Sequence, residues 1–297
     1  MLKGIPMEEL LTTKELADLL RLNEKKVYQL VREGAVPHVR IAGKWLFPKE
    51  HVLRWIDESV QRERDLLIVG SDDILLTRLL TSYSRQRFPD LTFYSPVGSL
   101  RGIQALSQRK GQACCVHLLD LETGEYNLPF LKRQLAPQQY VVVNLWHRRQ
   151  GLIVKKGNPL GIKGLEDVVR TGARFINRNE GSGTRILAEH LIQEKGLDLK
   201  EIVGFGEEAD SHLEVALKVF FGEADVGMGI EYVTHLFPLD FTPVQEERFD
   251  LVVPKELWPT KVIRKFIAYI DPVKICGLFR ALPGYDLRDT GKIVFES

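Results

Sequence analysis

The chain has 297 residues, a length that predicts two or three compact units, each with its own core. Its 41 basic and 40 acidic residues nearly cancel, so overall charge gives no argument for nucleic-acid binding and any such signal must be local. Three cysteines without a Cys-x-x-Cys pair exclude a disulfide framework. No export signal and no apolar run of membrane-spanning length is visible, so we expect a cytoplasmic protein with no membrane partner.

The chain begins with the pattern of two short helices. Thr12 can cap the first helix in a capping box with Glu15, and Asn23 can cap the second, which ends at Gly34. The apolar positions at helical spacing are Leu16, Leu19, Leu20, Val27, Leu30 and Val31. Together these signals predict a helix, a turn and a second helix.

A hairpin and a third helix are predicted next. Residues 37–47 form an alternating segment that turns at Ala42-Gly43, and Pro48 can start a helix. The apolar stripe of that helix is Val52, Leu53 and Ile56. From Arg21 to Lys49, seven basic residues stand against two acidic ones, a local positive charge that the whole chain lacks. This order of elements is typical of a winged DNA-binding unit.

Short motifs in this segment carry a family resemblance. They are Thr13-Lys14-Glu15-Leu16-Ala17, Val27-Tyr28, Gly34-Ala35-Val36-Pro37 and Gly43-Lys44-Trp45. By these motifs the segment resembles the excisionase and MerR-type helix-turn-helix family, which implies a winged helix-turn-helix domain over residues 7–60 that binds double-stranded DNA. The candidate DNA contacts are Lys25, Lys26, Tyr28, Gln29 and Arg32 on the second helix and Arg40 and Lys44 on the wing. The alternative is that Lys25 and Lys26 are solvated helix surface.

From residue 66 onward, apolar strands alternate with amphipathic helices, which predicts parallel sheets covered by helices. The predicted strands are Leu66–Val69, Leu91–Tyr94, Ala113–Leu119, Tyr140–Leu145, Gly151–Lys155, Arg174–Ile176 and Ala224–Gly229. A soft-metal site at Cys114, Cys115 and His117 is an alternative for one of these strands. Alternation on a buried strand explains the same residues more simply, so we predict no metal site.

Small and hydroxyl residues follow several of these strands. They form four junctions, Gly70-Ser71-Asp72, Gly98-Ser99, Gly181-Ser182-Gly183-Thr184 and Asp210-Ser211-His212. In open α/β sheets such junctions lie at the carboxyl ends of the strands, where helix starts offer unpaired N–H groups to an anion. Arg185 and His212 can add charge or neutral donors. For any single junction, ordinary helix capping is the favoured explanation because it is the commoner use of such residues, but four junctions in one domain favour a ligand site.

A second set of motifs spans nearly all of residues 66–255. The motifs are Gly98-Ser99, His117-Leu118-Leu119-Asp120, Gly124-Glu125-Tyr126-Asn127, Arg148-Arg149-Gln150-Gly151-Leu152, Gly157-Asn158-Pro159, Asn177-Arg178, Gly181-Ser182-Gly183-Thr184-Arg185, Gly222-Glu223-Ala224-Asp225-Val226-Gly227 and Glu247-Arg248-Phe249-Asp250-Leu251. By them the chain resembles the periplasmic-binding-protein-like domain that is found fused to molybdenum-cofactor biosynthesis proteins and to helix-turn-helix regulators.

This resemblance implies an α/β fold of type II, with two lobes joined by two crossover strands near Val141–Trp146 and Thr242–Val253. The domain would cover residues 66–297, with the second lobe at about residues 147–242, and would close on a ligand like a hinge. The implied ligand contacts are Ser71, Ser99, Ser182, Gly183, Thr184, Arg185 and His212. Molybdate or tungstate is the first ligand to test, and no cofactor is expected.

Taken together, these features predict a DNA-binding transcriptional regulator, most simply a homodimer, whose α/β domain binds a small anion to control DNA binding. An accessory protein of molybdenum-cofactor biosynthesis that binds a cofactor fragment or metal oxyanion is the alternative. A solute-binding transporter subunit is a third reading, against which the helix-turn-helix pattern argues. The chain has no Gly-x-Ser-x-Gly elbow and no Lys-bearing phosphate loop, so we expect no enzyme activity.

Overall fold

The computed structural model describes residues 9–62, 65–279 and 281–297, and the chain divides into two compact units, Met1–Arg64 and Asp65–Ser297. Residues 7 and 8 of the predicted DNA-binding domain lie outside the described residues. Within them, no helix is long and apolar enough to cross a membrane.

The first unit has the predicted order of elements. They are β1 (Leu10–Leu11), α1 (Thr13–Leu20), α2 (Glu24–Arg32), β2 (Val39–Ile41), β3 (Lys44–Pro48) and α3 (Lys49–Arg62). The predicted capping box is confirmed, because the Glu15 N–H donates to Thr12 Oγ1 (3.3 Å) and the Thr12 N–H donates to Glu15 Oε2 (2.7 Å). The Asn23 cap is confirmed as well, by a 2.9 Å bond from the Lys26 N–H to Asn23 Oδ1.

β1, β3 and β2 form a small antiparallel sheet. Ala42 and Gly43 both have positive φ, at 48° and 82°, which is the backbone of the tight hairpin turn predicted here. The core of the unit is Leu11, Leu16, Ala17, Val27, Val31, Val36, Phe47 and Val52. Leu19 and Leu53, which the periodicity placed on the apolar stripes, are 43% and 44% exposed, because each lies at the margin of its stripe and so small a unit covers only the centre.

One sheet runs through the second unit in the order β5-β4-β6-β11-β7-β10-β8-β9, with β12 and β13 added beside β7. The strands are β4 (Leu66–Gly70), β5 (Thr92–Pro96), β6 (Ala113–Val116), β7 (Tyr140–Lys155), β8 (Phe175–Arg178), β9 (Glu208–Ala209), β10 (Val226–Ile230), β11 (Leu239–Pro254), β12 (Tyr285–Asp286) and β13 (Ile293–Glu296). The helices are α4 (Ile74–Arg87), α5 (Ser99–Ser107), α6 (Leu128–Leu135), α7 (Leu165–Thr171), α8 (Gly183–Glu194), α9 (His212–Phe221), α10 (Lys261–Ile267) and α11 (Pro272–Leu278), with the short 3₁₀ helices η1 (Leu199–Glu201) and η2 (Glu231–His235).

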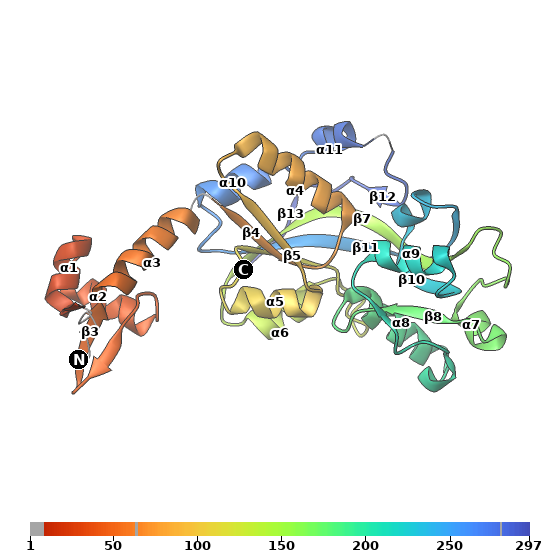
Figure 1. Cartoon of the computed structure of the whole chain (residues 1–297), viewed down its shortest axis with the longest axis horizontal. Helices are drawn as coiled ribbons and strands as arrows, with labels where there is room; N and C mark the ends of the chain where they lie inside the picture. The colour runs from red at the N-terminus through yellow and green to blue at the C-terminus, as the bar shows by residue number, and fades with distance from the viewer. Residues whose placement is uncertain (1–8, 63–64, 280) are drawn as a thin grey trace, which may run out of the picture. The chain divides into compact units, whose positions relative to one another are not determined.

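Two strands of 16 residues each, β7 and β11, join the two lobes of this unit and pair with each other antiparallel along their lengths (Figure 1). The first lobe contains β4, β5 and β6, which are parallel to one another, and the second contains β8, β9 and β10. The predicted parallel pairing is found within each lobe, but the sheet as a whole is not parallel. The sheet is mixed because both joining strands, together with the unpredicted β12 and β13, enter it antiparallel.

The prediction of two separate strands in residues 140–155 is wrong, because β7 is continuous. His147, Arg148, Arg149 and Gln150 read as a polar break, but they pair with residues 245–248 of β11 and stay extended. Tertiary pairing overrides the local polarity here.

Helices cover both faces of the first lobe. Figure 1 shows α4, α10 and α11 on one side of the sheet and α5 and α6 on the other. The corresponding cores centre on Leu79 and Phe266 on the α4 side and on Ile103 and Leu131 on the α5 side. The second lobe has a core of its own around Phe175.

Candidate functional site

The two lobes meet at the starts of four helices. In the first lobe these are α4 and α5, and in the second lobe α8 and α9. The Leu100 N–H donates to the Gly181 carbonyl oxygen (3.2 Å), and the His212 N–H donates to Asp72 Oδ2 (3.0 Å). A Cβ atom at Gly183 would collide with the His117 carbonyl oxygen, so this glycine lets α8 approach the end of β6.

Most of the predicted ligand contacts are buried in this region. Ser71, Ser99, Ser182, Gly183, Thr184 and His212 are all buried. Ser99 Oγ accepts the His117 N–H (3.2 Å), and Ser182 Oγ caps α8 by accepting the Arg185 N–H (3.2 Å). Ser182 is therefore an ordinary helix cap, the simpler of the two explanations given for its junction. Ser71 is not a cap, because Asp73 caps α4.

Arg185 does not share this environment. Its Nε donates to Glu189 Oε1 (2.9 Å), its Nη1 pairs with Glu208, and its side chain is partly exposed. The Arg185 guanidinium, which was predicted to contact an anion, is thus already paired with two carboxylates on the second lobe.

A set of charged and polar side chains lies at the same junction. All are buried except Asp72, which is partly exposed, and His212 alone among them was predicted as a ligand contact. We call this set the interlobe cluster, and its members are Asp72, Asp73, His117, Arg148, Gln150, Arg178, His212 and Glu247. Arg148, Gln150, Arg178 and Glu247 were visible beforehand only as members of family motifs, and His117 also as part of the soft-metal alternative. Asp72 belonged to a junction, and Asp73 belonged to no motif. Arg148 and Gln150 were hidden because their segment reads as a polar loop.

Arg148 is the centre of the cluster. Its Nη1 donates to Asp73 Oδ2 (2.7 Å), and its Nε pairs with Glu247 from the neighbouring strand β11. The other oxygen of Glu247 lies 2.6 Å from His117 Nδ1 and accepts a bond from Gln150 Nε2. Side chains of β7 and β11 therefore form one continuous polar network with Asp73 and His117, which follow the first-lobe strands β4 and β6.

Burial sets the protonation of these groups. It lowers the pKa of His212 well below 6.5, and the positive charges of Arg178 and Arg148 lower it further. It also lowers the pKa of His117, although Glu247 opposes this. Burial alone would raise the pKa of Glu247, but Arg148 and His117 outweigh it and hold that pKa below its ordinary value. The two histidines are thus favoured as neutral donors and acceptors.

Several buried polar atoms of this region lack a hydrogen-bond partner among the described residues. They are Thr184 Oγ1, Nδ1 and Nε2 of His212, Arg148 Nη2 and Gln150 Oε1. Leaving such an atom unsatisfied costs about 1–3 kcal/mol. Donors and acceptors are both present, so the set suits a small polar ligand. No group of three His, Cys, Asp or Glu suited to a metal ion occurs in the described parts of the chain. Cys114 and Cys115 lie in β6, whose residues are all buried, so the prediction of a buried strand here is confirmed.

The predicted DNA contacts lie on the surface of the first unit. Lys25, Lys26, Tyr28, Gln29 and Arg32 are exposed on α2, and Arg40 and Lys44 are exposed on the hairpin. Lys26 Nζ donates to Gln29 Oε1 (3.0 Å), and the Arg40 guanidinium lies 5.1 Å from the centre of the Trp45 ring. These contacts leave the basic side chains accessible to a polyanion.

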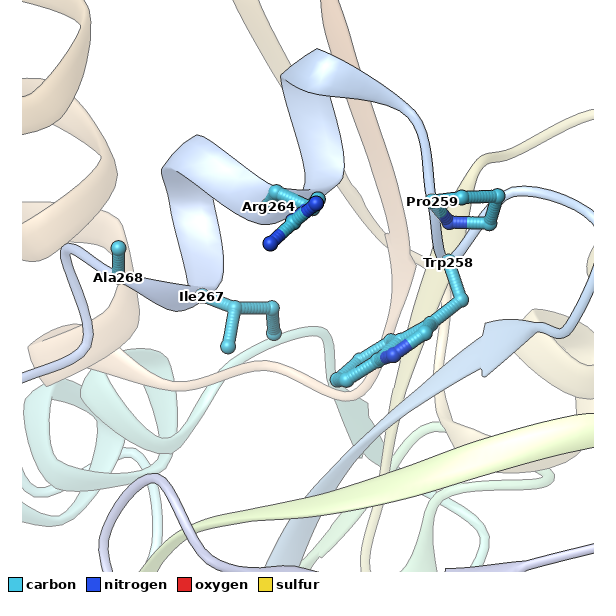
Figure 2. A pocket seen from close by; sticks show the side chains of 5 residues that line it. All are labelled: Trp258, Pro259, Arg264, Ile267 and Ala268. Atoms are coloured by element: carbon cyan, nitrogen blue, oxygen red, sulfur yellow. The ribbon is translucent and has the colours of Figure 1, made fainter.

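A pocket of about 390 Å³ lies beside α10 and contains none of the predicted ligand contacts (Figure 2). It is lined by Trp258, Pro259, Arg264, Ile267 and Ala268. Its lining residues come after Pro254 in the sequence, the last residue of β11, which pairs with Tyr140. The interlobe cluster lies further back along β11, where Glu247 pairs with Arg148. The pocket is therefore separate from the interlobe cluster.

Comparison with known proteins places both units. Residues 10–59 match the helix-turn-helix domain family, and residues 81–271 match the family described as the PBP superfamily domain. The uncharacterized protein YvgK of Bacillus subtilis (strain 168) is 28% identical over 304 residues, which cover 96% of this chain and 98% of YvgK. The relationship thus extends over both units.

Solved structures share the fold of the second unit. A putative phosphate ABC transporter substrate-binding protein with bound phosphate from Clostridium perfringens has a TM-score of 0.55 at 16% identity, covering 72% of this chain and 96% of that one. The tungstate ABC transporter from Geobacter sulfurreducens has a TM-score of 0.53 at 16% identity, covering 73% and 98%. The CcmR regulatory domain of Synechocystis PCC6803 in complex with 2-PG has a TM-score of 0.51 at 12% identity, covering 70% and 95%.

The predicted fusion of a helix-turn-helix domain with a periplasmic-binding-protein-like domain is confirmed by these matches. The mixed α/β architecture with two lobes agrees with them. Since the second match covers more than half of the chain, the protein belongs to the PBP superfamily domain family and carries a helix-turn-helix domain before it.

Proposed function

We propose that this protein is a transcriptional regulator whose binding to DNA is controlled by a small ligand held between the lobes of its second unit. The observation that carries the proposal is the combination of two features in one chain. A helix-turn-helix unit with an exposed basic helix precedes a domain whose lobes meet at buried polar atoms that lack partners within the described chain. The fold of that domain is also shared by the CcmR regulatory domain.

For the ligand we propose a small anion, with molybdate and tungstate as the first candidates. The starts of α5, α8 and α9 converge on the junction, and helix starts favour negative charge. Thr184 Oγ1 and Arg148 Nη2 can donate hydrogen bonds there. Structural relatives of this fold are described with phosphate and as a tungstate transporter. We further propose that the regulator acts as a homodimer on paired half-sites.

Thermal-shift titration of the full chain tests the ligand. Molybdate, tungstate, phosphate, sulfate and small carboxylates are each added in a concentration series, because a ligand that binds only the folded state raises the melting temperature as its concentration passes Kd. We expect one of these anions to raise it. No shift with any of them contradicts the anion proposal.

Thr184→Val is the matched variant. It keeps the size of the buried side chain and removes an unpartnered hydroxyl, so we expect a loss of about 1–3 kcal/mol of binding free energy. Thr81→Val is the control, because Thr81 is exposed on α4 and its hydroxyl bonds only within that helix, to the Thr77 carbonyl oxygen. Unchanged affinity in Thr184→Val removes Thr184 from the site.

A further inference from the structure

One carboxylate of the protein already occupies the position that an anion would take at the start of α9. Asp72 lies in the first lobe, between β4 and α4, and its Oδ2 accepts the backbone N–H of His212 at 3.0 Å. His212 is the first residue of α9, a helix of 10 residues in the second lobe. A helix start is where the backbone dipoles favour negative charge, so Asp72 satisfies it in place of a ligand.

The same carboxylate faces a buried cation of the second lobe. Arg178 Nη1 lies 4.0 Å from Asp72 Oδ2, and the remaining donors of Arg178 bond to the carbonyl oxygens of Ala209 and Asp210 and to Asn179 Oδ1. Arg148 is already engaged by Asp73 and Glu247. Both carboxylate partners of Arg148 lie closer to it than Asp72 lies to Arg178, so Arg178 is the less fully neutralised cation of the interlobe cluster, and Asp72 offsets its charge.

A second observation shows that Asp72 does not complete the site. Both ring nitrogens of His212 and the hydroxyl of Thr184 are buried without a partner in the described chain, although the His212 backbone is satisfied by Asp72. Asp72 itself lies on the segment between β4 and α4 and is 16% exposed, so its side chain reaches solvent. A ligand that reaches His212 and Thr184 meets this carboxylate at the start of α9.

We propose that Asp72 is a built-in competitor of the ligand: it bridges the two lobes in the free protein, and an anion must displace it from the His212 amide and Arg178 to bind. This inference rests on the proposed anion site. It makes Asp72 a determinant of affinity, because each bound anion must overcome the charge of Asp72 as well as its own loss of hydration.

Anion affinity tests the competition. Isothermal titration of the full chain with molybdate, tungstate, phosphate and sulfate compares the wild type with Asp72→Asn and Asp210→Asn. Both substitutions remove one negative charge near α9, but the Asp210 side chain is exposed and is not the partner of the His212 amide. We expect Asp72→Asn to bind the selected anion about tenfold more tightly than the wild type, since a charge in contact with the ligand is removed, and Asp210→Asn to stay within about twofold.

Hydrogen exchange of the ligand-free full chain tests the bridge itself. Asp72→Ala removes the acceptor, so we expect peptides that contain the His212 amide and the Leu100 amide to exchange faster than in the wild type and in Asp210→Ala. Asparagine is unsuitable here because its amide oxygen can still accept the bond. Unchanged exchange in Asp72→Ala overturns the bridge.

The two proposals can fail separately. Tight binding by the wild type that is unchanged or weaker in Asp72→Asn leaves the anion site in place and overturns the competition. Absence of anion binding by all the titrated proteins contradicts the anion site and, with it, the competition. Displacement is supported when Asp72→Asn gains anion affinity and Asp210→Asn does not.

Discussion

Arg148 connects three segments that are far apart in the sequence. Its guanidinium pairs with Asp73 at the start of α4 and with Glu247 in β11, and Asp73 also accepts a 2.9 Å bond from the Tyr285 hydroxyl of the C-terminal segment. All of the charges in this network are fully buried. A buried ion pair contributes little net stability, but removal of one partner strands the others in a medium of low dielectric constant.

We therefore expect Arg148→Ala to lower the free energy of unfolding of the second unit by about 3–5 kcal/mol. Arg149→Ala is the control, because Arg149 is 53% exposed and its ion pair with Glu231 is worth about 1 kcal/mol or less. Urea denaturation followed by tryptophan fluorescence, to which the buried Trp146 contributes, measures both. A loss below about 1 kcal/mol in Arg148→Ala would show that the network relaxes without its cation.

His212 makes the stability of the second unit depend on pH. Its folded-state pKa is lowered well below 6.5 by burial and by Arg178 and Arg148. Above pH 6.5 the residue is neutral in both the folded and unfolded states. Below pH 6.5 the unfolded residue binds a proton that the folded residue does not, so stability is lost as the pH falls. Burial also lowers the pKa of His117, so this residue makes stability fall with falling pH as well. The pKa of Glu247 is lowered below its ordinary value, so the stability that this carboxylate contributes is lost only in more acidic solution.

The melting temperature should accordingly fall between pH 7.5 and about pH 5.5, and His212→Gln should flatten this dependence, leaving the share that His117 contributes. His190→Gln is the control, since His190 lies partly exposed on α8. Thermal unfolding across this range, monitored by circular dichroism, gives the slopes. Equal slopes in the wild type and His212→Gln would contradict the assignment.

At the scale of elements, α2 is the helix of the first unit that we propose to read DNA. Its start and its orientation are specified by nearby residues. Asn23 caps the start, and Val27 and Val31 turn inward so that the basic side chains face solvent. A helix presented in this way can enter the major groove, and its lysine and arginine side chains release counterions from the phosphates they contact.

Lys25→Ala and Arg32→Ala should each weaken binding to a duplex selected from a random-sequence library and reduce the slope of log K against log salt by up to about 0.9. Lys200→Ala, an exposed substitution in the second unit, should change neither quantity. Fluorescence anisotropy at several salt concentrations measures the slope. If neither α2 variant departs from the wild type, α2 is not the reading helix. Lys25→Ala and Arg32→Ala should leave the affinity for the anion unchanged.

The joining strands illustrate why some elements cannot be read locally. β7 contains a polar run that is extended only because β11 supplies a partner nearly 100 residues later. β12, with only two residues, also forms by pairing with β7, whereas β13 has a short apolar run, Ile293-Val294-Phe295, that the strand prediction missed. The polarity of residues 147–150 indicates a loop until their partners Glu247 and His117 are placed beside them.

For the whole molecule, the proposed regulation requires that one ligand changes the affinity for the other. Coupling free energies of about 1–3 kcal/mol are typical, equivalent to about 5- to 150-fold. Coupling is reciprocal, so the same factor must appear whichever ligand is added first.

We expect a saturating concentration of the selected anion to change the affinity of the full chain for the selected duplex by such a factor. The duplex should change the anion Kd by an equal factor, and Thr184→Val should shift the anion concentration required without altering DNA affinity in its absence. Titration calorimetry with and without the duplex provides the comparison. An anion Kd that is the same in both titrations would contradict the proposed control of DNA binding.

The sequence by itself determined what depends on neighbours within a turn or two of chain. Capping at Thr12 and Asn23, the positive-φ hairpin turn at Ala42-Gly43, and the α/β alternation are signals of this kind, because a side chain that bonds to the adjacent backbone acts in the same way in any fold. Family motifs added the two-lobed fold. They also drew attention to the helix starts at which the ligand is proposed to bind.

Only the tertiary structure decided which charged side chains meet between the lobes. Arg148 and Glu247 are 99 residues apart, and Asp72 and His212 are 140 residues apart. Such pairs are stabilised when burial removes the water that would otherwise screen them, and burial is a property of the folded chain. For that reason Arg185, the cation nearest the glycine-hydroxyl motif in sequence, lies in surface ion pairs, while Arg178 and Asp72 face each other at the start of α9.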